Sequence, residues 1–551
     1  MQTRTGRVRS IAFGLALAGG LAMARPALAI ITPITCDQAA LAAVAPSNTF
    51  VDTAAPIAAV DTLPAYCNVI GHYVDSLAGA TGSPNNVNFQ LALPDPAVWN
   101  GKFLFLGNDG FAGSIQADVT TGFPYATAAT DTGHQSDSSL DASWALNDQL
   151  AQYDYGYRGV HFTAQASEAL TKAYYAGTAP TENYFGGCSD GGREAMVEAE
   201  QYPADFNGIV AGDPAIGDLI PGFNWNYHAL LKNRDSWIPA DKLQMVDQAV
   251  LDECDRKDGV VDGLIQDPRI CAFDPATLQC PARDSTPDTD PICLSQGQVQ
   301  ALRAIYKGLV TNKGVRIYPG YTQSDPGEEL DNLTDASGWG VWITGLLPAT
   351  IPVPVNGEPW GGSLLISPLQ WSFQDQLLKY FYAGSATYNS LAFDVNIDLA
   401  NFLKIYTVGG SPGDEAKALR AFKKLGGKLI IYHGWSDPAV TPLETVRFYR
   451  TQLIDNIFAG DAAEVRRFAR LFMVPGMHHC SGGPGPNVFD MLDPLDDWVT
   501  NHKAPDSILA VHYYDNDPAT FIDRSMPLCA FPETAHLIGS NLFEASSWRC
   551  F

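Results

Sequence analysis

The residues best suited to chemistry surround Ser189, in the segment Gly187-Cys188-Ser189-Asp190-Gly191. This G-x-S-x-G pattern follows the short apolar pair Tyr184-Phe185 and precedes a helix-forming stretch. A strand, a sharp turn and a helix in this order lift the serine hydroxyl clear of a sheet, where it can act as a nucleophile. The first N–H groups of the helix then lie where a negatively charged oxygen would form. Because such a pattern also occurs by chance in glycine-rich chains, a plain structural turn is the alternative.

A nucleophilic serine needs an acid and a histidine base, which in one common arrangement follow it along the chain in that order. Asp437 comes shortly after an apolar strand-like run at 428–432, and His479 comes shortly after another at 470–474. Loops at the C-terminal ends of parallel strands are the usual place for such side chains. Asp437 is therefore the candidate acid and His479 the candidate base. A helix cap for the segment after Pro438 is the alternative role for Asp437.

The cellular compartment of the protein decides whether its cysteines are expected to form disulfides. Within residues 1–29, Arg4, Arg7 and Arg9 precede an apolar run at 11–24, and small residues follow at 27–29. This pattern is typical of a cleaved secretory signal peptide. We therefore expect a secreted or periplasmic protein whose ten cysteines form disulfides rather than a metal site. Among the many possible pairings, spacing favours four local ones: Cys36–Cys67, Cys254–Cys271, Cys280–Cys293 and Cys529–Cys550. Cys188 and Cys480 are left to pair with each other.

The expected pairing of Cys188 with Cys480 helps to choose the catalytic base among the candidate histidines. Cys188 directly precedes the serine, and Cys480 directly follows His479. The Cα atoms of a disulfide lie within ~7 Å of each other, so a Cys188–Cys480 bond would hold the nucleophile and this base together. His479 is favoured on this ground, and His478 and His433 are the alternatives.

Strand-like and helix-like segments alternate around these residues. Short apolar runs at 88–93 and 102–106 predict strands, while the stretches 159–175 and 193–201 have the composition and spacing of helices. The same alternation returns after residue 428, with a helix predicted over 442–450. Strands and helices in alternation predict an α/β fold with a mostly parallel sheet covered by helices.

The alternation is lost between residues 216 and 415, where proline, aspartate and aromatic residues are frequent and four cysteines occur. We expect residues 216–415 to form a lid domain inserted between two parts of one core, 30–215 and 416–551. The total length of 551 residues agrees with this, because it exceeds the ~100–200 residues of an ordinary domain.

The charge balance narrows the class of partner. Acidic residues outnumber basic ones 60 to 34, which gives a formal net charge of −26. Such a field repels phosphate backbones, so neither nucleic acid nor an anionic membrane surface is an expected partner. Beyond the signal peptide, no stretch reaches the ~18 apolar residues of a membrane-spanning helix. A polyanionic substrate is not expected either, and the oligomeric state is left open.

The chain resembles the tannase and feruloyl esterase family, whose members share a Cys-Ser…Asp…His-Cys arrangement. Cys188-Ser189, Asp437 and His479-Cys480 match that arrangement, and further similar segments lie at 130–134, 156–158, 187–194, 474–477 and 480–486. The resemblance implies an α/β-hydrolase core, a lid inserted after about the sixth strand, a calcium site in the lid, and hydrolysis of aromatic acid esters such as gallates or ferulates. A mono(2-hydroxyethyl) terephthalate hydrolase and an acyltransferase on the same scaffold are the alternatives.

The resemblance also suggests how the oxyanion of the reaction would be stabilised. The glycine-rich segment 106–111 follows the strand predicted at 102–106, and the resemblance points to the N–H of Gly110 as one donor and the N–H of Asp190 as the other. A plain turn is the alternative for this segment.

A structural Ca²⁺ site is expected in the acidic loop at 255–264. Asp255, Asp258 and Asp262 offer carboxylate oxygens, and the backbone carbonyls of Val260 and Leu264 could complete the ~6–8 oxygen ligands that Ca²⁺ takes. The residues alone favour a solvated acidic loop equally, and similarity to the family's lid site favours calcium. The predicted local disulfide beside the loop would close it.

The acyl group is the least determined property. Relatives that hydrolyse the terephthalate monoester use a lid arginine to hold its free carboxylate, whereas residues 337–385 of this chain contain no arginine and only one cation, Lys379. A carboxylate in a desolvated pocket needs a charged partner. We therefore expect uncharged aromatic acyl esters to be preferred.

Overall fold

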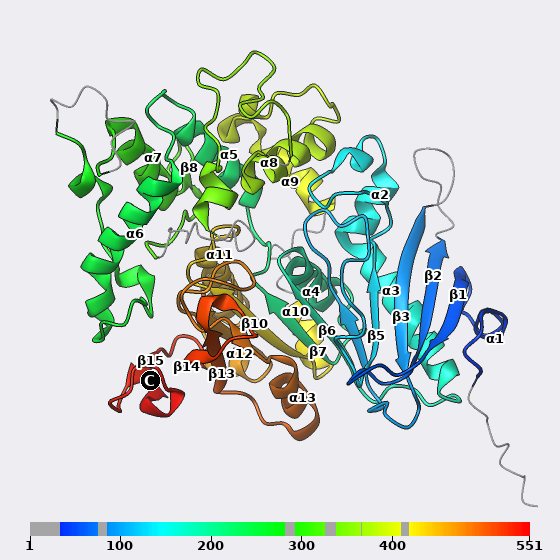
Figure 1. The fold of residues 1–551 in the computed structure, drawn as a ribbon. Helices are drawn as coiled ribbons and strands as arrows, with labels where there is room; N and C mark the ends of the chain where they lie inside the picture. Colours follow the sequence, from blue (N-terminus) through cyan, green and yellow to red (C-terminus); the bar gives the residue numbers. More distant parts are fainter. Residues whose placement is uncertain (1–33, 75–84, 282–291, 325–337, 365, 409–417) are drawn as a thin grey trace, which may run out of the picture.

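The structure is a computed structural model that describes residues 34–74, 85–281, 292–324, 338–364, 366–408 and 418–551 (Figure 1). The signal peptide predicted over 1–29 lies outside these residues. Within the described ranges, none of the helices combines the length and the apolar composition needed to span a bilayer.

A nine-stranded sheet forms the centre of the molecule. Its first three neighbouring pairs are antiparallel, and every pair from β5 to β11 is parallel. In spatial order the strands are β1 (Thr49–Ile57), β2 (Tyr66–Val74), β3 (Asn86–Pro94), β5 (Ala126–Thr130), β4 (Phe103–Leu106), β6 (Asn183–Cys188), β7 (Gly208–Gly212), β10 (Lys428–Gly434) and β11 (Ala469–Val474). The expected α/β fold with a mostly parallel sheet is confirmed.

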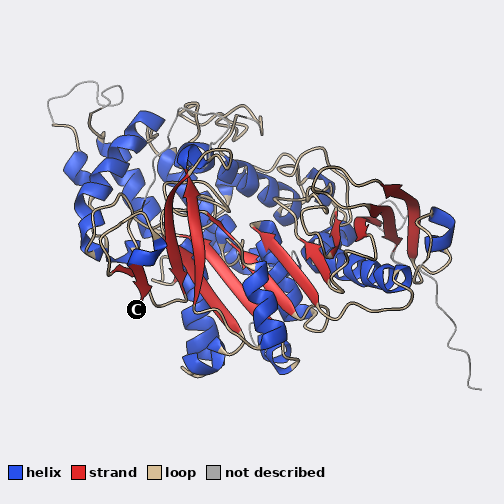
Figure 2. Cartoon of the chain, turned by 60° about the horizontal axis from the view of Figure 1, so that its bottom comes forward, coloured by secondary structure: helices blue, strands red, loops and turns tan. Residues whose placement is uncertain are grey.

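Helices cover both faces of this sheet (Figure 2). The helices of the core are α1 (Gln38–Ala42), α2 (Gln149–Tyr153), α3 (Gly159–Tyr174), α4 (Asp190–Gln201), α10 (Leu419–Lys424), α11 (Pro442–Arg447), α12 (Ala462–Arg466) and α13 (Leu492–Asn501). Successive strand residues point to opposite faces: Phe185 and Ile431 pack with α3 and α4, while Tyr184 and Ile430 pack with α13. Because both faces are buried, these strands are apolar throughout.

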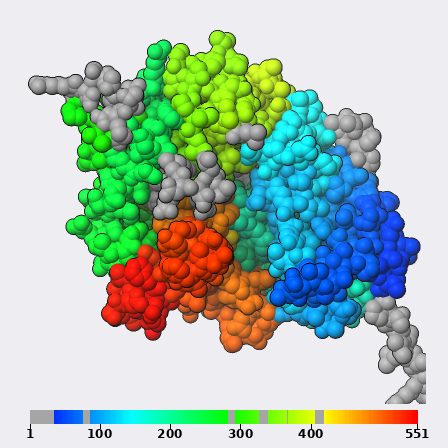
Figure 3. All heavy atoms as spheres, viewed as in Figure 1, coloured from blue at the N-terminus to red at the C-terminus, as the bar shows by residue number. Residues whose placement is uncertain are grey.

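The chain between β7 and β10 adds no strand to the main sheet. It contains α5 (Leu219–Leu230), α6 (Ala240–Cys254), α7 (Gln296–Lys307), α8 (Leu369–Leu377) and α9 (Val395–Val408), with a hairpin of β8 (Leu309–Val310) and β9 (Arg316–Tyr318). These elements share a hydrophobic cluster of their own and form the green to yellow-green upper left part of the molecule in the views of Figure 1 and Figure 3. The insertion follows the seventh strand, β7, where the resemblance implies a place after about the sixth.

The C-terminal part carries two small sheets that the sequence analysis did not predict. The first is antiparallel and consists of β12 (Val488–Phe489), β13 (Ser507–Tyr513) and β14 (Ile522–Cys529); the second pairs β15 (Ala535–Leu537) with β16 (Trp548–Cys550). Leu264 of the insertion packs into the cluster that these sheets form with Met526 and Trp548. The C-terminal region therefore braces the acidic loop of the insertion.

All ten cysteines are paired, in the five pairs that the sequence predicted. The bonds are Cys36–Cys67, Cys188–Cys480, Cys254–Cys271, Cys280–Cys293 and Cys529–Cys550. Four of them close short loops, and Cys188–Cys480 joins residues 292 positions apart. This bond ties the end of β6 to the loop after β11.

Candidate active site

Ser189 lies at the tight turn between β6 and α4, with φ 61° and ψ −119°. This is left-handed backbone that a non-glycine residue rarely adopts, and it is held in part by the Ser189 N–H, which donates to the carbonyl of Gly212 at 3.0 Å. A Cβ on Gly187 would come within 2.7–2.8 Å of the Gly191 backbone. Both glycines of the motif are therefore needed for the strand and helix to approach this closely.

The three residues predicted as nucleophile, base and acid form one hydrogen-bonded chain. His479 Nε2 lies 2.8 Å from Ser189 Oγ, and His479 Nδ1 lies 2.8 Å from Asp437 Oδ2. The other oxygen of Asp437 accepts the N–H groups of Ala439 at 2.7 Å and Val440 at 3.0 Å. Asp437 thus also has the backbone-capping role that was its alternative, and the two roles use different oxygens.

Burial and neighbouring charges shift the pKa values of Asp437 and His479 in the directions that proton transfer requires. Burial alone would raise the pKa of Asp437, but the His479 charge and hydrogen bonds from His433 and His479 bring it well below its usual range. Conversely, burial would lower the pKa of His479, and the carboxylate of Asp437 outweighs that effect and raises it. Asp437 is therefore ionised, and it favours the imidazolium that forms when His479 takes a proton from serine.

The two alternative histidines have other positions. His433 Nε2 lies 3.1 Å from Asp437 Oδ2, the oxygen that also contacts His479, and its Nδ1 lies 2.8 Å from Thr445 Oγ1. His478 is buried, and its N–H donates to the carbonyl of Gly482. Among the described residues only His479 contacts Ser189 Oγ through an imidazole nitrogen.

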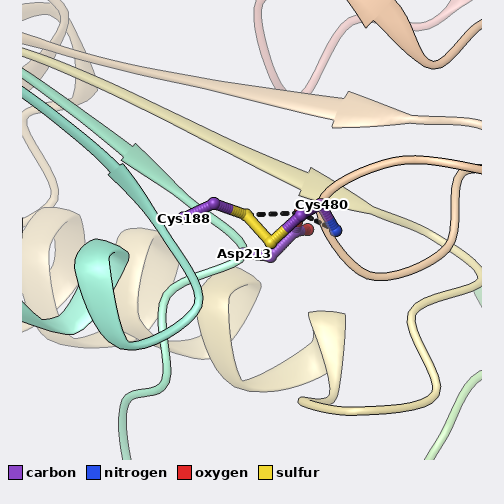
Figure 4. A group of neighbouring side chains, drawn as sticks. All are labelled: Cys188, Asp213 and Cys480. Carbon is purple, nitrogen blue, oxygen red and sulfur yellow. Dashed lines mark hydrogen bonds between the residues drawn. A yellow bond between two sulfur atoms is a disulfide. The ribbon is translucent and has the colours of Figure 1, made fainter. Parts of the chain in front are cut away.

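Asp213 is a buried carboxylate at this site that the sequence analysis did not single out. It lies beside the Cys188–Cys480 disulfide, whose Cα atoms are 6.0 Å apart (Figure 4). Its oxygens accept the N–H groups of Gly434 at 2.7 Å and Cys480 at 2.8 Å. A sequence signal was available, because Asp213 directly follows β7 and so stands at the same sheet edge as the other site residues.

The two predicted oxyanion donors lie beside the serine. Gly110 has φ +57°, and a Cβ there would lie 2.5 Å from the Ser139 carbonyl oxygen, so only glycine fits. Asp190 is the first residue of α4, and the first N–H groups of a helix have no partner within it. Gly110, Asp190, Ser189 and His479 all line one pocket.

A buried network connects the two donors. The hydroxyl of Tyr155 donates to Asp190 Oδ1 at 2.8 Å and lies 3.2 Å from the Gly110 carbonyl oxygen. Arg193 forms two hydrogen bonds to the Asp190 carboxylate, at 2.5 and 3.0 Å, and lies over the Tyr155 ring. Tyr155 therefore links the loop after β4 to the start of α4.

The pocket at the serine is predominantly apolar and is built from both the core and the insertion. Its remaining lining residues are Phe111, Tyr155, Arg193, Ala215, Leu219, Ile220, Phe223, Trp342, Phe373, Leu377, Phe381, Ala439 and Val440. Phe111 and Phe373 are in edge-to-face contact at 5.3 Å, and Trp342 contacts the His479 ring at 5.1 Å. A planar aromatic group suits these surfaces.

Cations near the pocket are already paired. Arg193 is buried with Asp190, and its remaining N–H groups donate to the carbonyls of Tyr155 and Gly156. Lys379 forms ion pairs with Asp375, at 2.7 Å, and with Glu358, and it is not among the pocket-lining residues. In the described part of the chain, neither cation presents an uncommitted charge to the pocket.

In the acidic loop of the insertion, two of the carboxylates accept backbone N–H groups. Asp255 accepts the N–H groups of Asp262 and Gly263, and Asp258 accepts those of Val260 and Gln266. Burial, together with repulsion from the neighbouring carboxylates, raises the pKa of Asp258 to about 6.

One cation already neutralises part of this charge. Arg524 donates to Asp262 Oδ2 at 3.0 Å and to its carbonyl at 2.7 Å. The carbonyls of Val260 and Leu264 accept no hydrogen bond from the described residues. Buried, mutually repelling carboxylates beside free carbonyls are chemically suited to a hard cation such as Ca²⁺, and Arg524 shares the charge of Asp262.

Three groups of side chains among the described residues have ligand atoms within 4.8 Å of one another, and the carboxylates of the acidic loop do not form one of them. One of the three groups consists of His161, Glu198 and Asp205. His161 Nδ1 and Asp205 Oδ2 lie 2.5 Å apart, the separation of a short hydrogen bond. The two remaining groups within 4.8 Å, among the described residues, contain the cysteines of the disulfide or the catalytic candidates themselves.

The nucleophile turn, the acid and the base at one edge of a mainly parallel sheet define an α/β-hydrolase. A model of the "Tannase and feruloyl esterase" family matches residues 67–551. The chain belongs to this family and is a carboxylic ester hydrolase.

Relatives and solved structures agree with this assignment. A curated esterase of Xanthomonas campestris pv. campestris is 34% identical over 526 residues, covering 89% of this chain and 85% of the relative. The mono(2-hydroxyethyl) terephthalate hydrolase of Piscinibacter sakaiensis is 33% identical over 542 residues, with the same coverage. The crystal structure of feruloyl esterase B from Aspergillus oryzae has the same fold, with a TM-score of 0.77 at 22% identity, over 94% of this chain and 99% of that one.

Proposed function

We propose that the protein is an exported serine esterase that cleaves esters of uncharged aromatic acids through an acyl-enzyme. The hydrogen-bonded chain of Ser189, His479 and Asp437, opening into an aromatic pocket, carries this proposal. The ten paired cysteines support export, because such bonds persist in oxidising compartments.

The reaction would proceed in two halves. Ser189 Oγ attacks the ester carbonyl while His479 Nε2 takes its proton, and the N–H groups of Gly110 and Asp190 stabilise the oxyanion. The C–O bond to the alcohol then breaks, and His479 returns the proton to the departing alcohol. In the second half, water loses a proton to His479 Nε2 and its oxygen bonds to the acyl carbon. The bond between the acyl carbon and Ser189 Oγ then breaks, and His479 returns the proton to Ser189 Oγ as the acid is released.

The proposed preference for uncharged acyl groups follows from the ion pairs of the cations near the pocket. A free carboxylate entering an apolar pocket loses its hydration and needs a charge-assisted partner. Arg193 and Lys379 are both committed to carboxylates, so a terephthalate monoester would find no such partner among the described residues. Gallate and ferulate esters carry no charge and need only the aromatic walls of the pocket and neutral donors.

Two measurements test this proposal. Ser189→Ala should reduce kcat by about 10³-fold or more in a folded protein, and near-normal turnover by that variant would refute the nucleophile. A kcat/KM panel of methyl gallate, methyl ferulate and mono(2-hydroxyethyl) terephthalate then ranks the acyl groups. A tenfold or greater advantage for the terephthalate monoester would overturn the charge argument. Product analysis with added alcohol separates hydrolysis from acyl transfer.

We further propose that the acidic loop binds one structural Ca²⁺ through Asp255, Asp258 and Asp262 and the carbonyls of Val260 and Leu264. The buried, mutually repelling carboxylates support this. Chelation should lower the melting temperature, and Asp258→Asn should reduce the size of that chelation effect. An unchanged melting temperature, with no calcium found by elemental analysis, would exclude the site.

A further inference from the structure

Three loops carry the candidate catalytic residues, and one buried side chain contacts all three. Asp213, with no exposed surface, follows β7 and has φ +35°, an unusual backbone for a side-chain-bearing residue. Its Oδ1 accepts the N–H of Gly434, three residues before Asp437, and its Oδ2 accepts the N–H of Cys480, next to His479. Through these bonds Asp213 fixes the positions of both the acid loop and the base loop.

The connection to the serine runs through the backbone. The N–H of Ser189 donates to Gly212, the residue before Asp213, and the Ser189 carbonyl accepts the N–H of Ala215. Figure 4 shows the Asp213 carboxylate between Cys188 and Cys480. Asp213 Oδ2 lies 3.3 Å from Cys188 Sγ, but this sulfur is in a disulfide and has no proton to donate. Burial raises the pKa of the Asp213 carboxyl to about 6, whereas His433, His479 and the N–H of Gly434 favour its charged form.

The charge of Asp213 also acts on the base. Asp213, Asp437 and His479 place one ligand atom each within 4.8 Å of one another, so two buried carboxylates flank one imidazole. Asp109, on the loop after β4, is a third and weaker negative charge near this ring. The charged and titratable groups that face Asp213 itself are His433, Asp437 and His479, with Tyr432 beside them.

We propose that Asp213 is a positioning residue for the esterase reaction: it orients His479 and the Asp437 loop through backbone N–H groups, and its charge stabilises the protonated form of His479. This inference rests on the proposed function. The Asp437 contact alone sets the tautomer of the imidazole. The Asp213 contact sets where residue 480, with its left-handed φ of 65°, holds the ring.

The test is Asp213→Asn, which keeps the size of the side chain and suits a positive φ but removes the charge and one acceptor. We expect kcat to fall about tenfold at an almost unchanged KM for methyl ferulate. Because a negative charge beside His479 is lost, the acidic limb of the kcat/KM profile should move about one pH unit lower, at the small end of the range for a charge 4–6 Å away. Asp213→Gly also suits the positive φ and should shift the acidic limb by the same amount. It replaces Asp213→Asn in the test if that variant does not fold.

The matched control is Asp131→Asn. Asp131 is also buried and accepts two backbone N–H groups, from Asn88 at 3.0 Å and Gly133 at 2.9 Å, but it contacts neither His479 nor Asp437. It should destabilise the protein without moving the acidic limb.

The inference is overturned if the acidic limb of the kcat/KM profile stays at the wild-type pH in both Asp213 variants. It is also overturned if Asp131→Asn lowers kcat as much as the Asp213 variants do. Ser189→Ala is assayed in parallel. If it is inactive while the Asp213 variants keep the wild-type profile, only this inference fails. If Ser189→Ala stays active, the proposed function fails first.

Discussion

Removing the Cys188–Cys480 disulfide should destabilise this protein more than removing any local disulfide. The bond closes a loop of 292 positions, whereas Cys529–Cys550 closes one of 21. The chain-entropy relation gives about 5.7 kcal/mol for the long loop and about 3.3 kcal/mol for the short one at 25 °C. Because denatured chains retain structure, and the measured range is about 2–5 kcal/mol, the difference of about 2 kcal/mol between the two is the firmer expectation.

The assay compares the double variants Cys188→Ala/Cys480→Ala and Cys529→Ala/Cys550→Ala by denaturant unfolding at 25 °C. The N–H of residue 480 is still held by Asp213 in the first variant, so we expect folded protein with a kcat reduced at most about tenfold. If the first variant lost less free energy of unfolding than the second, the loop-entropy reasoning would be refuted. A kcat lowered by 10³-fold in a folded protein would show instead that the disulfide, and not Asp213, positions His479.

Three further expectations follow from the same site. Tyr155→Phe removes the hydroxyl that bridges Asp190 and the Gly110 loop, so kcat should fall about 3- to 10-fold in steady-state assays with KM little changed; an unchanged kcat would count against the bridge. Gly110→Ala places a Cβ 2.5 Å from a carbonyl oxygen at a φ of +57° and should lower kcat by about 10²-fold or more, with circular dichroism verifying the fold. Because Asp437 raises the pKa of His479 and the base must be neutral, kcat/KM should fall as the pH drops through a value above 6.5, and an acidic limb below 6 would contradict this.

The sequence predicted those site residues that stand next to a recognisable strand or turn along the chain. Ser189 was recognisable because its glycines and the flanking strand and helix make the turn evident. Asp437 and His479 were recognisable because each follows an apolar run, and the C-terminal ends of parallel strands meet at one sheet edge. The cysteine spacing identified all five disulfides, since four pairs are local and the fifth remained by elimination.

Two strands of the main sheet that are rich in small residues were not predicted from the sequence. β5 (Ala126–Thr130) contains only alanine and threonine, and β7 (Gly208–Gly212) begins and ends with glycine. Both strands are buried on both faces, so neither alternates between apolar and polar residues. β5 has no large apolar side chain, and β7 has only the adjacent pair Ile209 and Val210. The C-terminal sheets pack partly on the main core, through Ile508, Ala510 and Leu528, and partly against Leu264 of the insertion.

The sequence by itself determined the class of fold, the pairs of cysteines, and the choice of Ser189, Asp437 and His479 as candidate nucleophile, acid and base, because these depend on residue type and on short-range order along the chain. Only the tertiary structure placed Asp213 between two loops more than 200 residues away, joined the two oxyanion donors through Tyr155, and paired Lys379 with Glu358 and Asp375. Each of these contacts joins side chains or loops through space. Their geometry depends on how the insertion, the sheet and the helices pack, which no local pattern in the chain records.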